Sequence, residues 1–354
     1  MTLQTIADQV GVSRMTVSNA FSRPDQLSAS MRQTILDAAK KLGYAGPDPA
    51  ARNLARGTTN AIGIVLTSSL RYAFDDDIAT GFLGTIAGEL APTGLAITLL
   101  SSAVVDDVIP ARDVPMDAAI VYSCDPDMTA ADWLTRRNLP MVFVDQEPAR
   151  GVTSINVDDR GGARQAAQHV VDLGHTRVGV MTAALGGTPG FVDDPASDAR
   201  GSKYVSRERL LGFLDALTPA GITPVVHRQL NSDDTEGHAV ALEMLGRPDR
   251  PTAVLCFSDV IASGVMRAAE ELGLDVPDDL SVVGFDDSPL ARRLRPQLTT
   301  VRQDIAEKGR TSAAELRRVM DAKRSGTKVR ARHVVLPTVL VVRDSTAKPP
   351  LAQA

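Results

Sequence analysis

Residues 11–21 read GVSRMTVSNAF, and this stretch decides how the amino-terminal part of the chain folds. Ile6 and Val10, four residues apart, predict a first helix that ends at Gly11. Ser13 is a suitable N-cap for a second helix. The residues spaced to point inward from that second helix are Val17 and Phe21. Two helices joined by a Gly-Val-Ser turn predict a helix-turn-helix.

A third helix is expected after this pair. It should start at about Ala29, with Ser28 as its cap, and stop at Gly43. The residues expected to face inward are Met31, Ile35, Ala38, Ala39 and Leu42. An ordinary small helical bundle would show the same pattern, so that alternative stays open at this point.

The outward face of the second helix carries side chains that can read DNA. In a helix-turn-helix this helix enters the major groove by its N-terminal end. Arg14 can bond guanine, Asn19 can bond adenine, and the Met15 thioether can pack on a thymine methyl. Thr16 and Ser18 are expected on phosphates.

The charge distribution agrees with a DNA-binding amino-terminal part. Residues 1–60 contain seven basic and four acidic groups, a net charge of +3. The other 294 residues contain 31 basic and 39 acidic groups, a net charge of −8. A basic segment on an acidic body suits contact between that segment and a polyanion.

The segment AGPDPAARNLARGTT, residues 45–59, predicts a short helix between Asp48 and Gly57. At about eight residues it is shorter than the ~12–15 that an isolated helix needs in water, so it should order only against a partner. Leu54, among alanines, suits a wedge in the minor groove, and Arg52 is also expected to contact DNA. The alternative is a solvated linker whose leucine touches the next domain.

From Ala61 the pattern alternates between buried strands and helices, which predicts a doubly wound α/β body with enough strands for two domains. The expected strands are 61–66, 95–100, 118–123, 141–145, 177–181, 252–257 and 280–285. The expected helices are 78–91, 130–137, 160–173, 207–217, 236–245 and 260–272. Ligands of such sheets bind beyond the carboxyl ends of the strands. Asp145 and Asp259 follow strands and suit a hydroxyl-rich ligand, although Asp259 could equally cap the helix that follows it.

Several classes of protein are excluded by what the sequence lacks. No run approaches the ~18 apolar residues of a membrane span, and the amino terminus MTLQTIADQV does not resemble a signal peptide. Cys124 and Cys256 are far apart in apolar contexts, which predicts two buried thiols in a reducing cytoplasm. There is no GxSxG, P-loop or GxGxxG motif, and the five histidines lack metal-ligand spacing. The carboxylates at 75–77 are interpreted as a surface run at a helix start. We therefore expect no enzyme activity, cofactor, metal or membrane partner.

The series of motifs resembles the lactose-repressor and galactose-repressor (LacI/GalR) family of bacterial regulators over nearly the whole chain. The matching stretches are TLQTIADQVGVSRMTVSNAF, LGY, PAARNLARG, DLGHTRVGVM, RERLLGFLDAL, SDVIASGVMRAAEELGLDVPDDLSVVGFDD, PQLTTVRQD and VLPTVLVVRDST. The resemblance implies an all-α helix-turn-helix domain and an α/β effector domain of the periplasmic-binding-protein type. The latter has two doubly wound parallel-sheet subdomains.

The resemblance also implies domain boundaries. The helix-turn-helix domain is expected over 1–46, the hinge helix and linker over 47–60, and the effector and dimerisation domain over 61–345, before a tail at 346–354. The chain should cross between subdomains near 159, 288 and 324. These crossings give an N-subdomain of 61–158 and 288–323, and a C-subdomain of 159–287 and 324–345.

The family pattern carries over to individual residues. Arg14, Met15 and Asn19 fall at its base-reading positions, and Leu54 at its hinge leucine. The positions implied to line the effector site are Ser68, Tyr72, Phe74, Asp145, Arg209 and Asp259. Asp158 could belong to the site or to a hinge. From the residues alone, Arg209 could instead be solvated, and Tyr72 and Phe74 could pack within a loop.

Two segments depart from the family pattern. Ser232, in NSDDTEG, stands where a stacking ring is common, which favours a small polar ligand over a flat apolar one. Residues 183–206 predict a long loop, which is either a lid over the effector or a disordered surface excursion. The tail lacks leucine heptads, which favours a homodimer over a tetramer.

The sequence thus predicts a dimeric repressor of a near-palindromic double-stranded DNA operator, controlled by a small-molecule effector. A sugar or sugar derivative is the effector expected from the resemblance. A non-sugar metabolite acting as co-repressor is the alternative. A solute-binding protein is a more distant one, because neither a signal peptide nor a use for the helical segment is found.

Overall fold

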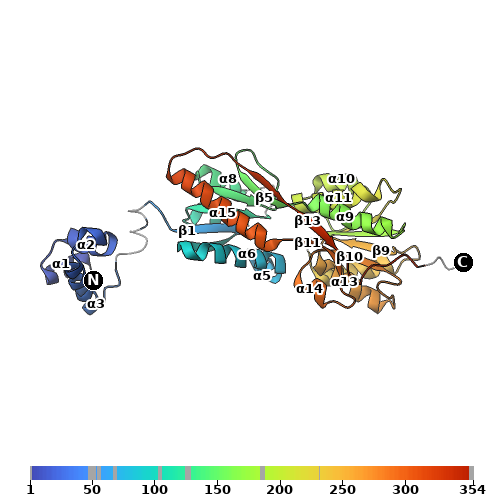
Figure 1. The fold of residues 1–354 in the computed structure, drawn as a ribbon, viewed down its shortest axis with the longest axis horizontal. Coiled ribbons are helices and arrows are strands. Elements are labelled where there is room, and N and C mark those ends of the chain that lie inside the picture. Colours follow the sequence, from blue (N-terminus) through green and yellow to red (C-terminus); the bar gives the residue numbers. More distant parts are fainter. Residues whose placement is uncertain are drawn as a thin grey trace. The chain divides into compact units, whose positions relative to one another are not determined.

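The computed structural model describes residues 2–46, 53, 57–66, 70–102, 106–123, 129–183, 188–230 and 232–350, without the side chains of Pro24 and Tyr72. The chain divides into two compact units, Met1–Asn60 and Ala61–Ala354. We call them the head and the body (Figure 1).

The head contains α1 (Leu3–Val10), α2 (Arg14–Ser22), the short 3-10 helix η1 (Pro24–Gln26) and α3 (Ala29–Lys41). The predicted caps are confirmed, because the Thr16 amide donates to the Ser13 hydroxyl and the Met31 amide donates to the Ser28 hydroxyl. Gly11 ends α1 in the left-handed region, at φ 73°, where glycine is favoured. These local signals suffice to set the helix boundaries.

The head core consists of seven buried residues, Ile6, Ala7, Val17, Ala20, Ile35, Ala38 and Ala39. The expected inward position of Met31 is wrong, since its side chain is 37% exposed. Met31 lies in the first turn of α3, and the buried positions of this helix begin one turn later, at Ile35.

The first lobe of the body is built on a six-stranded sheet with the order β12-β5-β4-β3-β1-β2. Its strands are β1 (Ala61–Leu66), β2 (Ala96–Ser101), β3 (Ala118–Tyr122), β4 (Met141–Val144), β5 (Thr153–Val157) and β12 (His333–Leu336). All pairings in this sheet are parallel. One face packs against α6 (Asp77–Leu90) and α15 (Ile305–Arg324), with α5 (Leu70–Asp75) at the start of α6. The other face packs against α7 (Pro110–Asp113) and α8 (Thr129–Arg136), so the sheet is covered on both sides.

The second lobe is built on a seven-stranded sheet with the order β13-β11-β10-β9-β6-β8-β7. Its strands are β6 (Val178–Ala183), β7 (Gly190–Val192), β8 (Val225–Gln229), β9 (Ala253–Cys256), β10 (Ser281–Asp286), β11 (Thr299–Gln303) and β13 (Thr338–Val341). The edge strands β7 and β13 run antiparallel to their neighbours. The predicted doubly wound α/β architecture is confirmed in both lobes.

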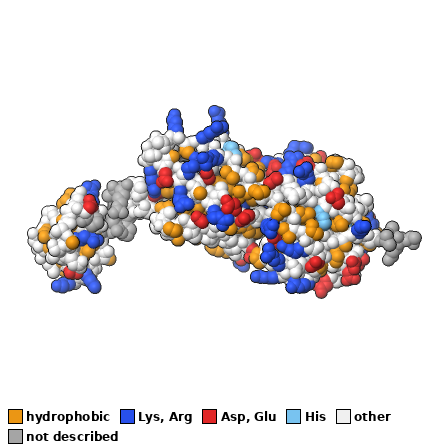
Figure 2. Space-filling view, in the orientation of Figure 1, with side chains coloured by type: hydrophobic (Ala, Val, Ile, Leu, Met, Phe, Trp, Pro, Cys, Tyr) orange, Lys and Arg blue, Asp and Glu red, His pale blue; other side chains and the backbone are white. Residues whose placement is uncertain are grey.

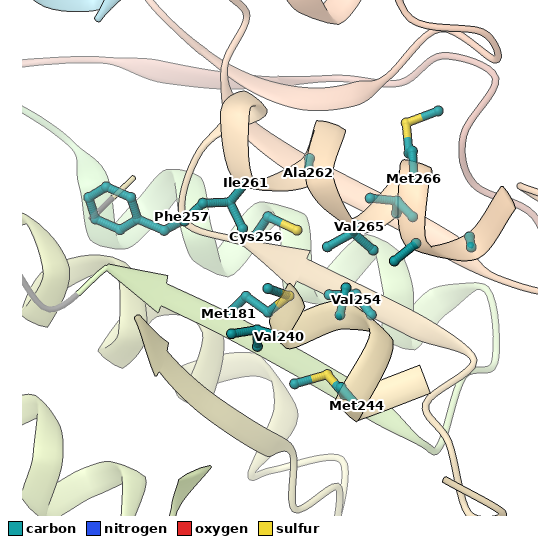
Figure 3. Packing of buried hydrophobic residues seen from close by; sticks show 14 of the residues in the cluster. Met181, Val240, Met244, Val254, Cys256, Phe257, Ile261, Ala262, Val265 and Met266 are labelled. Atoms are coloured by element: carbon teal, nitrogen blue, oxygen red, sulfur yellow. The ribbon is translucent and has the colours of Figure 1, made fainter. Parts of the chain in front are cut away.

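Helices cover both faces of the second sheet. On one side lie α9 (Asp159–Asp172) and α11 (Tyr204–Leu217). On the other lie α12 (Asp234–Leu245) and α13 (Asp259–Glu271), and α14 (Pro289–Arg293) follows β10. Figure 3 shows Met244 of α12 and Val265 of α13 approaching Val254 of β9. Cys256 lies in this core, unpaired and buried as predicted, whereas Cys124 lies outside the described residues.

Two of the three expected crossings between the lobes are wrong. The first crossing lies between Val157 of β5 and Asp159 of α9. β11 pairs with β10 in the second sheet, so the chain returns to the first lobe only after Gln303, not near 288. β12 pairs with β5 in the first sheet, so the last crossing is at Pro337, not near 324. The reason is that strand pairing, which sequence periodicity does not specify, fixes where each strand belongs.

The segment 183–206 is not a continuous loop. It contains β7, which pairs with β8 at the sheet edge, and α10 (Pro195–Gly201). Asp194 caps α10 by accepting from the Ser197 amide. Of the described residues in this segment, Val205 alone lines the cavity between the lobes, and it belongs to α11. The predicted lid therefore finds no support in the described part of the segment.

The tail is tied to the second lobe rather than free. Ser345 is fully buried and donates its hydroxyl to the Val282 carbonyl. The Ala347 carbonyl lies 2.9 Å from Nε2 of His175, whose ring is also buried. The boundary expected at 345/346 therefore has no structural counterpart.

Candidate functional site

The outward face of α2 is the first candidate site. Met15 is 69% exposed and Arg14 is also exposed, whereas Val17 and Ala20 behind them are fully buried. Thr16, Ser18 and Asn19 are half-buried. All five side chains of α2 that were expected to contact DNA therefore reach the surface of the head.

Two polar contacts on this face restrict the side chains further. Oγ1 of Thr16 lies 2.8 Å from Oγ of Ser13, so it shares the N-cap of α2. Nδ2 of Asn19 donates to Oε1 of Gln26 at 3.1 Å. Gln26 was not expected from the sequence. Arg52 and Leu54, the two expected contacts of the hinge segment, lie outside the described residues.

The second candidate site is a cavity of about 580 Å³ in the body, where the two lobes meet. The carboxyl ends of strands from both sheets open into it. From the first sheet these ends are Leu66 of β1, Tyr122 of β3 and Asp145 after β4. From the second sheet they are Phe257 after β9, Asp286 of β10 and Gln303 of β11. This is where ligands of doubly wound sheets bind.

Arg209 of α11 contacts several groups on the second-lobe side of the cavity. Its Nε donates to Oδ1 of Asp159 at 2.8 Å, and its Nη1 donates to the Phe257 carbonyl at 2.5 Å. Oδ1 of Asp286 lies 3.5 Å from Nη1. The guanidinium carbon lies 3.6 Å from the ring centre of Phe285. Arg209 is 4% exposed, so it is a buried cation with carboxylate and carbonyl partners rather than a solvated one.

Asp145 holds the first-lobe side through Lys308 of α15. Nζ of Lys308, itself 1% exposed, donates to Oδ2 of Asp145 at 2.6 Å. Oδ1 of Asp145 has no hydrogen-bond partner among the described residues. Oε1 of Gln303 is likewise unpartnered there, while Nε2 of Gln303 donates to Asp286 at 2.7 Å. Two buried acceptors in the wall of the cavity are thus left for a ligand to satisfy.

Burial shifts the carboxyl groups around the cavity towards their neutral forms. Desolvation raises the pKa of Asp159 to about 6 despite the nearby Arg209. Desolvation also raises the pKa of Asp286 well above its usual value, and that of Asp76 above its own. A protonated Asp286 can donate a hydrogen bond as well as accept one.

The lining is nevertheless rich in carboxylates. Seven aspartates line the cavity, Asp75, Asp76, Asp77, Asp145, Asp233, Asp234 and Asp286. The arginines of the lining are Arg71, which pairs with Asp75 at 3.5 Å, and the buried Arg209. The run at 75–77 lies at a helix start, as interpreted, with Asp75 and Asp77 exposed, and it also lines the rim of the cavity. The body surface seen in Figure 2 is otherwise a mixture of basic and acidic side chains.

Not all predicted effector residues meet in this cavity. Asp145 and Arg209 line it. Phe74 is 58% exposed and is not among the lining residues, and Asp158 is exposed as the N-cap of α9. Asp259 is fully buried beneath the cavity, where it accepts from Oγ1 of Thr300 at 2.5 Å and from the Ser288 amide at 2.7 Å. Ser68 lies outside the described residues, and the side chain of Tyr72 is not described.

Asp286, Gln303 and Lys308 were missed by the sequence reasoning. Asp286 ends the strand-like run LSVVGFD in the same way that Asp145 ends MVFVD, so the signal that found Asp145 could have found it too. Gln303 and Lys308 lie in β11 and α15, elements that the periodicity did not reveal. No group of three or more His, Cys, Asp or Glu within the described ranges could hold a metal ion. None of the helices described is both long and apolar enough to cross a bilayer.

Comparison with known proteins finds matches for both the head and the body. Residues 2–46 match the model of bacterial regulatory proteins of the lacI family, and residues 167–346 match a periplasmic binding protein-like domain. An HTH-type transcriptional regulator of Mycobacterium tuberculosis is 37% identical over 99% of this chain and 97% of its own. The chain belongs to the LacI family. As a LacI-family member it is a DNA-binding transcriptional regulator.

Two solved structures of the family are similar over 98% of this chain and 99% of theirs. One is the lac repressor dimer bound to operator and the anti-inducer ONPF, with 27% identity and a TM-score of 0.76. The other is the CelR–cellobiose complex, with 25% identity and a TM-score of 0.68.

The raised pKa of Asp259 gives a test of the burial of this carboxyl group beneath the cavity. Burial raises this pKa to about 6, so the folded state favours the neutral acid. The stability that the neutral Asp259 contributes is complete below about pH 4, the ordinary pKa range of an aspartate. This contribution is lost as the pH rises through 6. Asp259→Asn, which cannot ionise, should lack this loss. Between pH 4 and pH 7 the free energy of unfolding of the wild type should fall relative to the variant by on the order of 2 kcal/mol. Chemical denaturation of both proteins across this pH range measures the difference between their free energies of unfolding. A difference that stays constant with pH would contradict the raised pKa of Asp259.

Proposed function

We propose that the protein is a homodimeric repressor that binds a near-palindromic operator through its two heads and releases it in response to an effector bound between the lobes. The observation that carries this proposal is the pairing of two features in one chain. One is an outward-facing helix with Arg14, Met15 and Asn19. The other is a cavity lined by strand ends from both lobes. The similar structure of the lac repressor, a dimer bound to operator, supports the dimer and the operator.

In this proposal each head reads one half-site. Arg14, Met15 and Asn19 face base edges, and Thr16 and Ser18 hold phosphates. The hinge segments, with Arg52 and Leu54, enter the minor groove between the half-sites. Their interactions with the groove offset the conformational entropy that the segments lose when they fold there.

The effector acts on the angle between the lobes. A molecule that touches Asp145 on the first lobe and Gln303 on the second binds one relative position of the lobes more tightly than another. The same angle sets the separation of the two hinge segments in the dimer, so the effector shifts the population on or off the operator. An inducer favours the off state, and the alternative co-repressor favours the on state.

The chemistry of the cavity favours an uncharged polyhydroxyl effector. Asp145 and Gln303 offer buried acceptors that hydroxyl groups can satisfy, while Phe257, Leu66 and Val260 supply an apolar wall. The lining carboxylates outnumber the two lining arginines even without Asp76 and Asp286, whose pKa values burial raises, so the cavity repels a phosphate group. The similar structure of CelR in complex with cellobiose supports a sugar-like ligand. Among sugar derivatives, neutral ones are therefore preferred over phosphates.

The proposed insertion of Leu54 into the minor groove of the operator is tested with Leu54→Ala. A side chain that wedges between base pairs acts only where both hinges are ordered, so the variant should bind the selected operator at least tenfold more weakly. Its binding to bulk DNA, which depends on phosphate contacts, should stay nearly unchanged. Titration of full-length protein with both duplexes at fixed salt measures the two affinities. Equal losses on both would refute the wedge.

The charge of the effector is tested by thermal unfolding with neutral sugars, cyclitols and their phosphates. A bound ligand at 100 times its Kd adds about 2.7 kcal/mol to stability, so a neutral polyol should raise the Tm and its phosphate should not. Asp75→Asn combined with Asp77→Asn removes two rim charges without touching the cap residue Asp76. This variant should improve the relative affinity for the phosphate about tenfold. Asp132→Asn, exposed on α8, is the matched control. Stronger binding of phosphates by the wild type would overturn the preference.

A further inference from the structure

A hydrogen bond on the head joins an expected base-reading residue to a residue with no assigned role. Nδ2 of Asn19, in the last turn of α2, donates to Oε1 of Gln26, the last residue of η1, at 3.1 Å. Both side chains reach the surface of the head. The role of this contact rests on the proposed function, because it concerns how Asn19 reads a base.

The backbone fixes Gln26 relative to Asn19. The Arg23 amide donates to the Asn19 carbonyl at 2.8 Å and so ends α2. The Gln26 amide then donates to the Arg23 carbonyl at 3.1 Å. Leu27, the next residue, packs against the head core. Two successive backbone hydrogen bonds and one apolar anchor therefore hold η1 beside the end of α2.

The contact leaves Asn19 with the groups that adenine requires. An asparagine amide has one acceptor oxygen and two N–H donors. Pairing with adenine uses the oxygen for N6 and one N–H for N7. The second N–H is free to donate to Gln26 at the same time. If the Asn19 amide rotated by 180°, its oxygen would face Oε1 of Gln26, and two acceptors would oppose each other.

Gln26 needs its own restraint, because its amide could rotate together with that of Asn19. Nε2 of Gln26 makes no hydrogen bond within the described part of the head. A DNA phosphate only accepts hydrogen bonds, so it pairs with Nε2 of Gln26 and not with Oε1. A phosphate contact would therefore fix the order of atoms in Gln26, and through it the order of atoms in Asn19.

We propose that Gln26 is a positioning residue for base recognition. It donates to a backbone phosphate through Nε2, accepts from Asn19 through Oε1, and so holds the Asn19 amide in the orientation that selects adenine. Gln26 thereby links a contact that carries no sequence information to one that does.

The test uses full-length protein and an operator selected from randomised duplexes. Asn19→Ala first identifies the base pair at which preference is lost, by about tenfold. At that base pair, Gln26→Ala should reduce the preference for adenine three- to tenfold, as expected for one neutral hydrogen bond. The reduction should disappear in the Asn19→Ala background. Gln33→Ala is the matched control, because Gln33 is exposed on α3 and donates to Asp37 of the same helix.

Gln26→Glu separates positioning from mere structural support. A carboxylate still accepts from Asn19, so the preference for adenine should remain. It cannot donate to phosphate and adds a negative charge, so affinity for every sequence should fall. Loss of preference in Asn19→Ala with full retention in Gln26→Ala would overturn this proposal and leave the proposed function intact. An Asn19→Ala variant with unchanged preference at every position would overturn both this proposal and the base-reading role of Asn19.

Discussion

The structure depends on one topological constraint: the carboxyl ends of parallel strands from two sheets open into the same cavity. The chain crosses between the lobes after Val157, after Gln303 and at Pro337, so neither lobe is a continuous segment. The three connections leave from β5, β11 and β12, which lie at or next to an edge of their sheets. The other strand ends that line the cavity are therefore not joined by the chain. A ligand between those ends contacts both sheets, and that geometry allows a small molecule to change the angle between the lobes.

Charge burial at the lobe boundary follows from this constraint. Arg209 stays protonated at any working pH, so its burial is tolerated only because Asp159, the Phe257 carbonyl and the faces of Phe257 and Phe285 surround it. Lys308 and Asp145 form a second buried pair on the first lobe. Desolvation offsets part of the attraction within each pair, so a buried pair stabilises the fold by less than its Coulomb attraction alone. The effect of these pairs is to fix the side chains that line the cavity before a ligand arrives.

The parts of the fold that the sequence predicts are those set by local interactions. Ser13 and Ser28 cap their helices as expected, and Gly11 ends the first. The longest helix, α15, was missed because its buried face contains Lys308, Ser312 and Glu315, which hide the apolar period. The sequence could not show that β11 belongs to the second sheet and β12 to the first. Each assignment depends on pairing with a neighbouring strand, which periodicity does not specify.

The candidate site was predictable to a similar degree. Asp145 was found because a polar residue ends an apolar strand, and the same signal misled for Asp259, which turns inward to Thr300. Arg209 was identified through the family resemblance, and its burial explains why a helical periodicity alone could not assign it.

The central claim is that effector binding in the cavity and operator binding by the heads are energetically coupled. The most direct test measures the affinity for each ligand in the presence and absence of the other. The effector found by unfolding screens should be titrated into full-length protein with and without saturating operator, and the operator with and without saturating effector. The account predicts that both affinities change by the same factor, fivefold or more, because coupling free energy is shared by the two sites. Effector affinity that is identical on and off the operator would contradict it.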